Sequence, residues 1–466
     1  MTKDVLVVCA THRDRRELAK IAPDLGLRLH FHDYASLQLE NLAGSLSGDN
    51  SIESPYREIA DLVERFSGSG LHAVISTDDY PGSVIAAVVA KRLGLPGISP
   101  VASLRCQHKY LCRLDQQRLV PQAAVKFSLV DSRAPTLRVL DYPVFVKPVK
   151  SFFSIGASRV DSPAQFPAAV RNATLPEPFY RPFDELLRLH PELGLAEVGS
   201  HCVLAEALLI GHQCTLEGYV RRGSAHTLGV VDSIFYPGTQ AFQRFEYPSS
   251  LPSAVQARLH RIAADLMEGI GYGEGFFNVE FMVDLERETA HIIEVNPRLA
   301  SQFADLYEKV DGTNSYRMLL DIALGRPPSG KRRGGRHRMA ASCALRRFED
   351  AYVAGLPSDR SIERLRARYP EVRVEILATK GEWLSQCMQD GCSFRYAIVS
   401  IGGGDRADIL GILEDCVAEL RFEFQEHAIP GASMERPEVR SPPGDPPAAA
   451  FRLSGFSDSG RGIPSR

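Results

Sequence analysis

The sequence predicts a protein of mixed α/β and α+β class, with an open parallel sheet at the N-terminus, a two-part core and a small α+β C-terminal domain. Two observations carry this prediction. Within residues 1–100, short apolar strands alternate with helices, which is typical of parallel sheets with right-handed crossovers. Within residues 203–330, several strands follow one another and end in a hairpin. A chain of 466 residues is long enough for about two to four such domains.

The N-terminal unit ends near residue 100, where Gly94-Leu-Pro-Gly97 closes it. Its alternating elements are expected as strands at 4–9, 27–32 and 71–76, and as helices before residue 25 and at 52–66 and 82–93. Residues 101–202 form the next predicted domain, which begins with a helix carrying Lys109 and Arg113 and contains a strand at 142–148.

Residues 203–330 form a third predicted domain, rich in strands and ending at the Gly- and Pro-containing segment 325–330. Its expected elements are strands at 203–207, 214–221 and 226–231, a helix at 252–270, the hairpin and a helix at 314–324. Residues 331–428 are expected to form an α+β domain with strands near 338–345, 372–378 and 396–401 and a helix at 406–420. Residues 429–466 are rich in Pro, Gly, Ser and Arg, so we predict a disordered tail.

The hairpin at residues 276–296 places two glutamates opposite each other. When its turn is centred on Arg287, Glu280 falls opposite Glu294, with Asn296 on the same face as Glu294. Like charges in such a position are unfavourable unless a cation lies between them. Hard oxygen ligands of this kind suit Mg²⁺ bound to substrate phosphates. The alternative is a solvated hairpin whose glutamates face water.

Two further features could contact phosphates. Lys147 lies in a short strand just before Pro148, where a lysine either extends to solvent or meets an anion. The following segment, residues 150–160, is a loop of small residues between two strands, and its backbone N–H groups could surround a phosphate.

In their order along the chain, these features resemble the ATP-grasp superfamily. The resemblance rests on Lys109, Lys147, the loop Ser151–Ser158, the strand end Ala205-Glu-Ala-Leu-Leu209 and the string Glu294-Val-Asn-Pro-Arg298 after the partner Glu280. It covers about residues 1–325, and is similar to the branch of carboxylate–amine (L-amino-acid) ligases and biotin-carboxylase-like proteins. It implies a pre-ATP-grasp, Rossmann-like domain over 1–100 and a two-subdomain ATP-grasp core over 101–202, with the phosphate loop, and 203–330, with the metal hairpin.

The resemblance implies a role for each matching residue. ATP would be bound by Lys109, Lys147, Ser154, Gly156, Glu206, Ala207, Leu208, Gln213 and Glu217. Magnesium would be held by Glu280, Glu294 and Asn296, and Arg298 would stabilise the acyl phosphate. Gln213 stands where relatives often have a ribose-binding glutamate, and Leu299-Ala-Ser-Gln302 replaces a frequent Gly-Gly. The acceptor pocket is expected near Ser301, Gln302 and Asp305, and these departures predict that it is unusual.

The resemblance implies an ATP- and Mg²⁺-dependent ligase that joins a small carboxylate to an amine. Two alternatives stay open, a nucleotide-binding module without ligase activity and bicarbonate activation of the biotin-carboxylase kind. A net charge of −3 and the absence of a long apolar run predict a cytoplasmic protein without nucleic-acid or membrane partners. A homodimer is compatible with these features.

Overall fold

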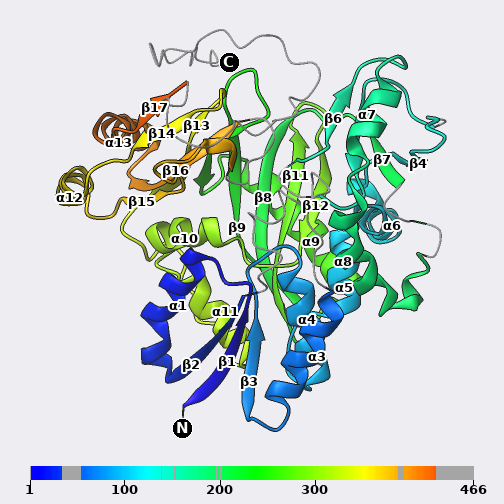
Figure 1. Ribbon diagram of the computed structural model, residues 1–466, viewed down its shortest axis with the longest axis horizontal. Coiled ribbons are helices and arrows are strands. Elements are labelled where there is room, and N and C mark those ends of the chain that lie inside the picture. The colour runs from blue at the N-terminus through cyan, green and yellow to red at the C-terminus, as the bar shows by residue number, and fades with distance from the viewer. Residues whose placement is uncertain are drawn as a thin grey trace.

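The N-terminal unit of the protein is a parallel sheet of order β2-β1-β3. The computed structural model describes residues 2–33, 54–137, 139–151, 154–195, 198, 202–386 and 393–426. Its elements are β1 (Lys3–Val8), α1 (His12–Leu25), β2 (Leu27–His32), α3 (Pro55–Phe66), β3 (Leu71–Ile75) and α4 (Gly82–Arg92) (Figure 1). A capping box between Thr11 and Asp14 starts α1, and left-handed Gly26 ends it. The predicted alternation and the parallel pairing are confirmed.

An antiparallel sheet of order β12-β11-β8-β9-β10-β13-β16-β15 forms the centre of the molecule. Its strands are β8 (His212–Arg221), β9 (Ser224–Phe235), β10 (Phe242–Tyr247), β11 (Gly275–Asp284), β12 (Thr289–Asn296), β13 (Met339–Arg347), β15 (Arg373–Ile376) and β16 (Phe394–Gly403). Helix α9 (Ser253–Gly269) packs on β8 and β9, and α10 (Ala304–Asp311) packs near β10 and β13. The predicted hairpin is confirmed, whereas β10 was not anticipated.

A smaller antiparallel sheet of order β4-β7-β5-β6 lies beside the end of the central sheet that β12 and β11 form (Figure 1). Its elements are β4 (Phe127–Asp131), β5 (Val144–Pro148), β6 (Ser158–Val160) and β7 (Cys202–Ala207), with α7 (Phe166–Ala173) packed against them. Helices α5 (Pro100–Gln107) and α6 (Lys109–Leu119) precede it, and α8 (Glu177–Arg188) packs on the N-terminal unit. Helices α7 and α8 were not predicted, because prolines, including Pro182 inside α8, obscure their helical spacing.

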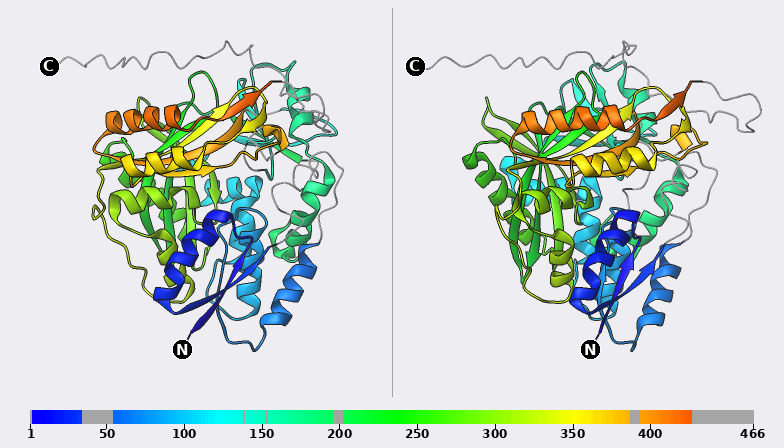
Figure 2. Two further views of the ribbon diagram at one scale, coloured as in Figure 1. Left: turned by 60° about the vertical axis from the view of Figure 1, so that its left-hand side comes forward. Right: turned by 90° about the vertical axis from the view of Figure 1, so that its left-hand side faces the viewer.

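The C-terminal segment continues the central sheet through β13, β16 and β15. Helices α12 (Asp359–Arg368) and α13 (Arg406–Glu419) cover its outer face, on the side away from the N-terminal unit (Figure 2). Strands β14 (Tyr352–Gly355) and β17 (Glu423–Gln425) form a separate pair. Hydrogen bonding therefore runs across the predicted boundary at residue 330, while the predicted tail, 429–466, lies outside the described residues.

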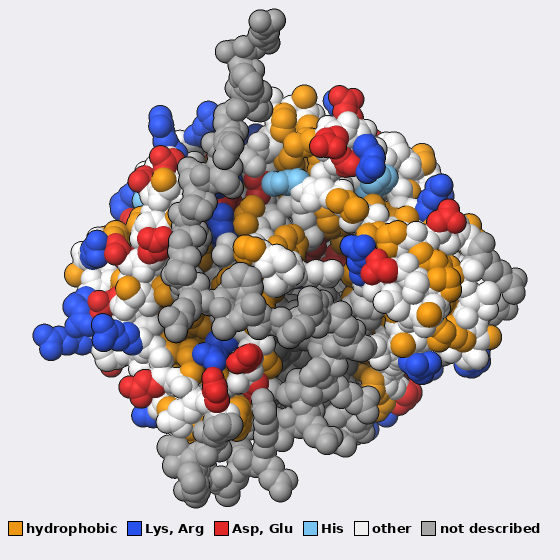
Figure 3. Space-filling view, turned by 90° about the horizontal axis from the view of Figure 1, so that it is seen from above, with side chains coloured by type: hydrophobic (Ala, Val, Ile, Leu, Met, Phe, Trp, Pro, Cys, Tyr) orange, Lys and Arg blue, Asp and Glu red, His pale blue; other side chains and the backbone are white. Residues whose placement is uncertain are grey.

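Helix α11 (Ser315–Ala323) returns the chain to the N-terminal unit, where it packs with α1 against the parallel sheet. This return brings the end of β3 close to the segment that follows β12. Among the described residues, no helix is both long and apolar enough to cross a membrane. On the face in Figure 3, acidic and basic side chains are interspersed, in keeping with the small net charge.

Candidate active site

The hairpin of β11 and β12 has the register that the sequence predicts. Glu280 lies opposite Glu294, and Asn278 lies opposite Asn296. The Asn296 amide donates to Asn278 Oδ1 at 2.9 Å and to Glu280 Oε1 at 3.3 Å. Two carboxylates and an amide therefore gather at one end of the hairpin.

The electrostatics of the two glutamates differ. Burial and the facing Glu294 raise the pKa of Glu280 to about 8. Burial acts on Glu294 as well, but Lys109 and Lys147 hold the pKa of that carboxyl below its usual range. One carboxyl thus resists ionisation because it faces an ionised neighbour, and a bound cation would relieve this conflict.

The hairpin fits a hard divalent cation that keeps part of its water shell. No group of three or more His, Cys, Asp or Glu side chains in the described part of the chain could hold a metal by itself. Magnesium, however, commonly takes one or two protein carboxylates and completes its shell with water and substrate phosphates. The facing pair of Glu280 and Glu294, with Asn296 beside it, is a donor set of that kind.

A bulge in β12 directs Glu294, and Arg113 holds this bulge in place. The register shifts between Glu280 and Phe281, which leaves Ile293 as the extra residue of β12. Arg113, on α6, donates to the carbonyl oxygens of Ile292 at 2.9 Å and of Ile293 at 2.7 Å. A buried arginine that the sequence analysis left without a role therefore fixes the strand that carries Glu294.

Arg113 and Lys147 both bind Glu206. Arg113 makes a two-pronged contact at 2.7 and 3.1 Å, and Lys147 Nζ lies 2.9 Å from Glu206 Oε2. Burial lowers the pKa of Lys147, and Glu206 opposes this effect. Burial opposes ionisation of Glu206 too, yet the two cations bring its pKa down to about 2. Glu206, predicted to contact adenine, is in this structure a buried counter-ion.

Two further lysines lie close by, Lys109 beside Glu294 and Lys150 beside Asp79. Lys109 Nζ lies 3.3 Å from Glu294 Oε2 and donates to the Ser151 carbonyl oxygen at 2.9 Å. Lys150, which the sequence analysis did not single out, is almost fully buried, with its ammonium 3.6 Å from Asp79 Oδ2. Its ammonium also lies over the ring of Tyr80, 4.8 Å from the centroid.

The predicted phosphate loop connects β5 to β6. Ser154 and Gly156 both have positive φ, at 57° and 73°. A side chain at Gly156 would approach Pro148 and the Asn172 carbonyl oxygen to about 3.0 and 3.1 Å, so glycine is required there for space and conformation. Phe152 and Phe153 of this loop lie outside the described residues.

The remaining predicted ATP contacts lie on β7 and β8. Gln213 donates to Glu280 Oε2 at 3.3 Å, which places it beside the carboxylate pair of the hairpin. Glu217 is fully buried and accepts the Ala300 N–H at 2.5 Å, and burial raises its pKa to about 8. Ala207 ends β7 and pairs through its N–H with the Lys126 carbonyl oxygen, and Leu208 follows directly.

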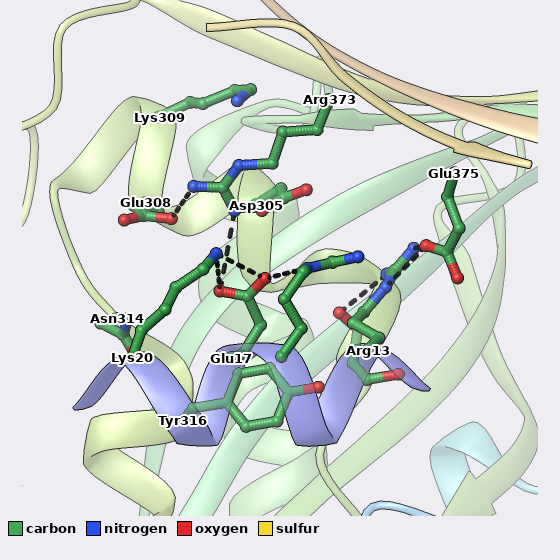
Figure 4. Close-up of polar contacts among 12 residues, drawn as sticks. Arg13, Glu17, Lys20, Asp305, Glu308, Lys309, Asn314, Tyr316, Arg373 and Glu375 are labelled. Atoms are coloured by element: carbon green, nitrogen blue, oxygen red, sulfur yellow. Dashed lines mark hydrogen bonds and ion pairs between the residues drawn. The ribbon is translucent and has the colours of Figure 1, made fainter. Parts of the chain in front are cut away.

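The predicted acceptor residues take part in a different group of contacts. Gln302 donates to Ser342 Oγ, the Ser301 carbonyl oxygen accepts from Arg13, and Asp305 pairs with Arg373. Asp305 belongs to a junction cluster of charges between α1, α10 and β15, shown in Figure 4 and consisting of Arg13, Glu17, Asp305, Glu308, Arg373 and Glu375. A substrate role for Ser301, Gln302 and Asp305 stays a prediction.

Arg298, predicted to act on the acyl group, reaches the N-terminal unit. Its Nε lies 3.7 Å from Asp79 Oδ1, at the end of β3. Asp79 was missed, although polar residues just after a parallel strand commonly line a ligand site. A cleft, here called the hairpin cleft, lies beside this contact and is lined by Asp79, Cys106, Gln107, Lys109, Lys150, Ser151, Glu294, Val295 and Asn296.

Comparisons with known proteins agree with this arrangement. An ATP-grasp domain model matches residues 140–305. A D-alanine–D-alanine ligase of Kineococcus radiotolerans is 27% identical over 295 residues, which cover 61% of this chain and 69% of that protein.

Two solved structures show the same fold over nearly the whole chain. An L-amino acid ligase from Bacillus licheniformis has a TM-score of 0.68 at 16% identity and covers 91% of this chain and 99% of its own. The biotin carboxylase domain of a 2-oxoglutarate carboxylase from Hydrogenobacter thermophilus, solved with MgADP, has a TM-score of 0.59 at 15% identity and covers 91% of both chains.

Proposed function

We propose, from the ATP-grasp domain that this chain carries over residues 140–305, that the protein is a magnesium-dependent ligase that uses ATP to activate a small carboxylate and joins it to an amine. The observation that carries the proposal is the facing pair of Glu280 and Glu294, with Lys109 beside it. Such a pair of like charges is costly in the empty protein and becomes favourable when Mg²⁺ and phosphates arrive. The ligases and the MgADP complex among the similar proteins support the same reading.

Each group of site residues takes one part of the substrate in this proposal. Lys109 and Lys147 contact the ATP phosphates, over which the loop with Ser154 and Gly156 folds. Glu206, Ala207 and Leu208 border the adenine, and Gln213 and Glu217 lie toward the ribose. Glu280, Glu294 and Asn296 hold magnesium, which when bound offsets the negative charge on the phosphates.

The chemistry is a phosphoryl transfer followed by an acyl transfer. The lysines orient the γ-phosphate toward the substrate carboxylate, because positioning and charge compensation supply most of the catalysis in such transfers. A neutral amine then attacks the acyl phosphate, and the amide forms as inorganic phosphate leaves and the nitrogen loses a proton. The oxyanion that forms at the acyl carbon in between needs a donor already in place. We assign this role to Arg298, whose Nε lies 3.7 Å from Oδ1 of Asp79, a residue that lines the hairpin cleft.

A direct test measures ADP release from ATP and Mg²⁺ with pairs of small carboxylates and amines, and identifies products by mass spectrometry. We expect ADP release to need both substrates and to yield an amide. Binding of Mg-ATP without turnover for any pair would favour a nucleotide-binding module. Bicarbonate-dependent ADP release that needs biotin and no amine would favour carboxylation.

A further inference from the structure

The segment between α11 and β13 contains a basic loop, defined here as residues 331–338. Five of its eight residues are Lys or Arg, although the whole chain has a net charge of −3. All five are exposed, and they are Lys331, Arg332, Arg333, Arg336 and Arg338. None of them is among the residues that line the hairpin cleft, so the proposed ligase function gives these charges no role.

Four of the five cations form no ion pair in the part of the chain that the structure describes. The exception is Arg336, whose guanidinium lies 2.5 Å from Glu371 Oε1. Arg332 donates instead to a backbone group, the Thr227 carbonyl oxygen, at 3.2 Å. Like charges gathered on one loop repel one another, and an anionic partner would relieve this repulsion.

The backbone of the basic loop is held in place by α10, β16 and the residues that follow α10. The Lys331 N–H donates to Thr313 Oγ1 at 2.9 Å, and the Arg333 N–H donates to Oδ1 of buried Asp311 at 2.8 Å. Backbone N–H groups that donate to carbonyl oxygens at 3.0 or 3.1 Å belong to Gly334, Gly335, His337 and Arg338. A loop fixed in this way loses little conformational entropy when a partner binds.

This anchoring forces an unfavourable backbone conformation. Arg333 has a φ of 55°, in the left-handed region that residues with a Cβ rarely adopt. A Cβ at Gly335 would collide with the Lys309 carbonyl oxygen, so only glycine allows the loop to approach α10 this closely. Strained backbone that the surrounding contacts maintain is found mainly at functional sites, which favours a binding role for the loop.

The number of unpaired cations favours a short acidic peptide segment over a nucleic acid. Proteins that bind DNA tightly typically make about six to ten phosphate contacts, more than the four unpaired cations of the loop allow. Glu371 beside the loop is 41% exposed, and it would repel a long polyanion. The carboxylates of Asp and Glu match the forked geometry of arginine, which predominates in the loop.

A membrane surface fits the loop less well than an acidic peptide. Within the described residues, the large hydrophobic side chains that are exposed are Leu114, Val139, Ile210, Leu285 and Phe348, and none of these belongs to the loop. Stable attachment to a bilayer takes an apolar anchor in addition to a basic patch. An extended segment of eight residues spans at most about 25–30 Å, so a partner segment of similar length would cover the loop.

We propose that the basic loop is a docking surface for an acidic segment of a partner protein, whose Asp and Glu side chains pair with its unpaired cations. The surface lies outside the candidate active site, and the proposal does not depend on the ligase function. Binding relieves the repulsion among the cations, and the rigid backbone already presents them to the partner.

The test titrates a decaglutamate peptide into the fluorescently labelled, full-length protein and follows binding by thermophoresis. Four exposed ion pairs correspond to a Kd on the order of 1 mM. We expect this Kd to rise several-fold when the salt concentration is raised from about 50 to about 300 mM, because the Debye length shortens. Absence of binding at the lower salt concentration would overturn the proposal.

A double variant assigns the binding to the loop. Lys331→Ala combined with Arg333→Asn removes two cations, and asparagine tolerates the left-handed backbone. We expect the Kd to rise by about tenfold. The control combines Arg92→Ala with Arg171→Ala, two exposed residues on α4 and α7, and should keep the wild-type Kd. Equal weakening in both proteins would show that only net charge matters and would overturn the proposal.

Two further measurements keep the result decisive. If the double variant does not fold, as judged by its melting temperature, Lys331→Glu alone takes its place, because this side chain is exposed and a reversed charge should weaken binding as strongly. An oligomer of twenty thymidylates and vesicles of phosphatidylglycerol are titrated at the same salt concentration. Tighter binding of either one than of decaglutamate would overturn the acidic segment as the partner.

Discussion

The hairpin cleft and the junction cluster both assemble charges from distant parts of the chain, but they pair these charges differently. In the junction cluster every cation meets an anion. Arg13 donates to Glu375 through Nε at 3.1 Å, and Arg373 binds Asp305 and, at 2.8 Å, Glu308 (Figure 4). Burial disfavours the charge on Arg13, yet Glu375 raises its pKa overall.

In the hairpin cleft, like charges face each other. Glu280 lies opposite Glu294, and buried Lys147 and Lys150 both have lowered pKa values because burial outweighs their partners. Among the described residues, one acceptor atom each of Asp79 and Gln107 has no hydrogen-bond partner. Balanced charges tie α1 to β15, whereas unbalanced ones leave contacts for a ligand to complete.

Glu294→Gln is expected to have the largest effect, which is a loss of turnover. The substitution keeps the shape of the side chain but removes the charge opposite Glu280, so the proposed magnesium site would lose a ligand where charge develops. We expect kcat to fall by about a thousandfold or more, because metal stabilisation of transferring charge amounts to several kcal/mol. ADP release under saturating Mg-ATP measures it.

Glu375→Gln is the matched control, since it neutralises a carboxylate of the junction cluster. We expect its kcat to stay within about threefold of wild type while its stability falls. Equal losses of turnover in the two variants would refute the distinction between the regions.

Arg113→Leu tests whether the orientation of the Glu294 side chain depends on the buried contacts of Arg113. The change leaves Glu206 with Lys147 alone and the two bulge carbonyls without their donor. We expect a loss of about 3–5 kcal/mol in the free energy of unfolding, as for other broken buried pairs. Urea denaturation measures it, with Arg118→Leu on the exposed side of α6 as a control that should change little.

Arg298→Lys should reduce product formation by about a hundredfold and leave ADP affinity unchanged. Lysine keeps the charge but cannot reproduce the planar fork that an acyl phosphate accepts. Single-turnover kinetics and calorimetric ADP binding separate the two effects. Full activity of this variant would leave Arg298 as a structural partner of Asp79.

The hairpin was predictable from the sequence because its information is local. A period of two and a charged turn set the register of Glu280 and Glu294 within about twenty residues. The parallel sheet was predictable from another local pattern, the alternation of short apolar strands with helices. Lys109, Lys147, Glu280, Glu294 and Arg298 could then be named through a family resemblance.

The junction cluster could not be predicted, because its contacts join residues far apart. Arg13 meets Glu375 across 362 positions, and no periodicity records such a pair. The bulge at Ile293 and its contact with Arg113 depend on backbone carbonyls, which every residue has. The orientation of Gln107 likewise comes from neighbours in space.

Arg13→Met should destabilise the protein without impairing its chemistry. Arg13 binds Glu375 and the Ser301 carbonyl oxygen, and Glu375 can recover water because it is partly exposed. We expect a loss of about 1–2 kcal/mol in the free energy of unfolding. Calorimetry measures it, and a kcat within about threefold of wild type would confirm that the cluster is structural.

A further expected effect is a pH dependence of the stability that arises at Asp78, next to Asp79. Burial, with a contribution from Asp79, raises the pKa of Asp78 to about 7, although the Gly82 N–H donates to it at 2.7 Å. A carboxyl with a raised pKa binds its proton more tightly in the folded state than in the unfolded state. Its contribution to stability is therefore lost as the pH rises from about 4 to about 7.

Asp78→Asn removes this titration and keeps an oxygen that can accept the Gly82 N–H. We expect the free energy of unfolding of the wild type, relative to the variant, to decrease between pH 5 and pH 8 by no more than a few kcal/mol. Urea denaturation of both proteins without ligand gives this difference directly, because other titrating groups contribute equally to the two curves. If the free energies of unfolding of the two proteins change with pH in parallel, Asp78 is ionised throughout this range. The charges that follow β3 would then be as well compensated as those of the junction cluster.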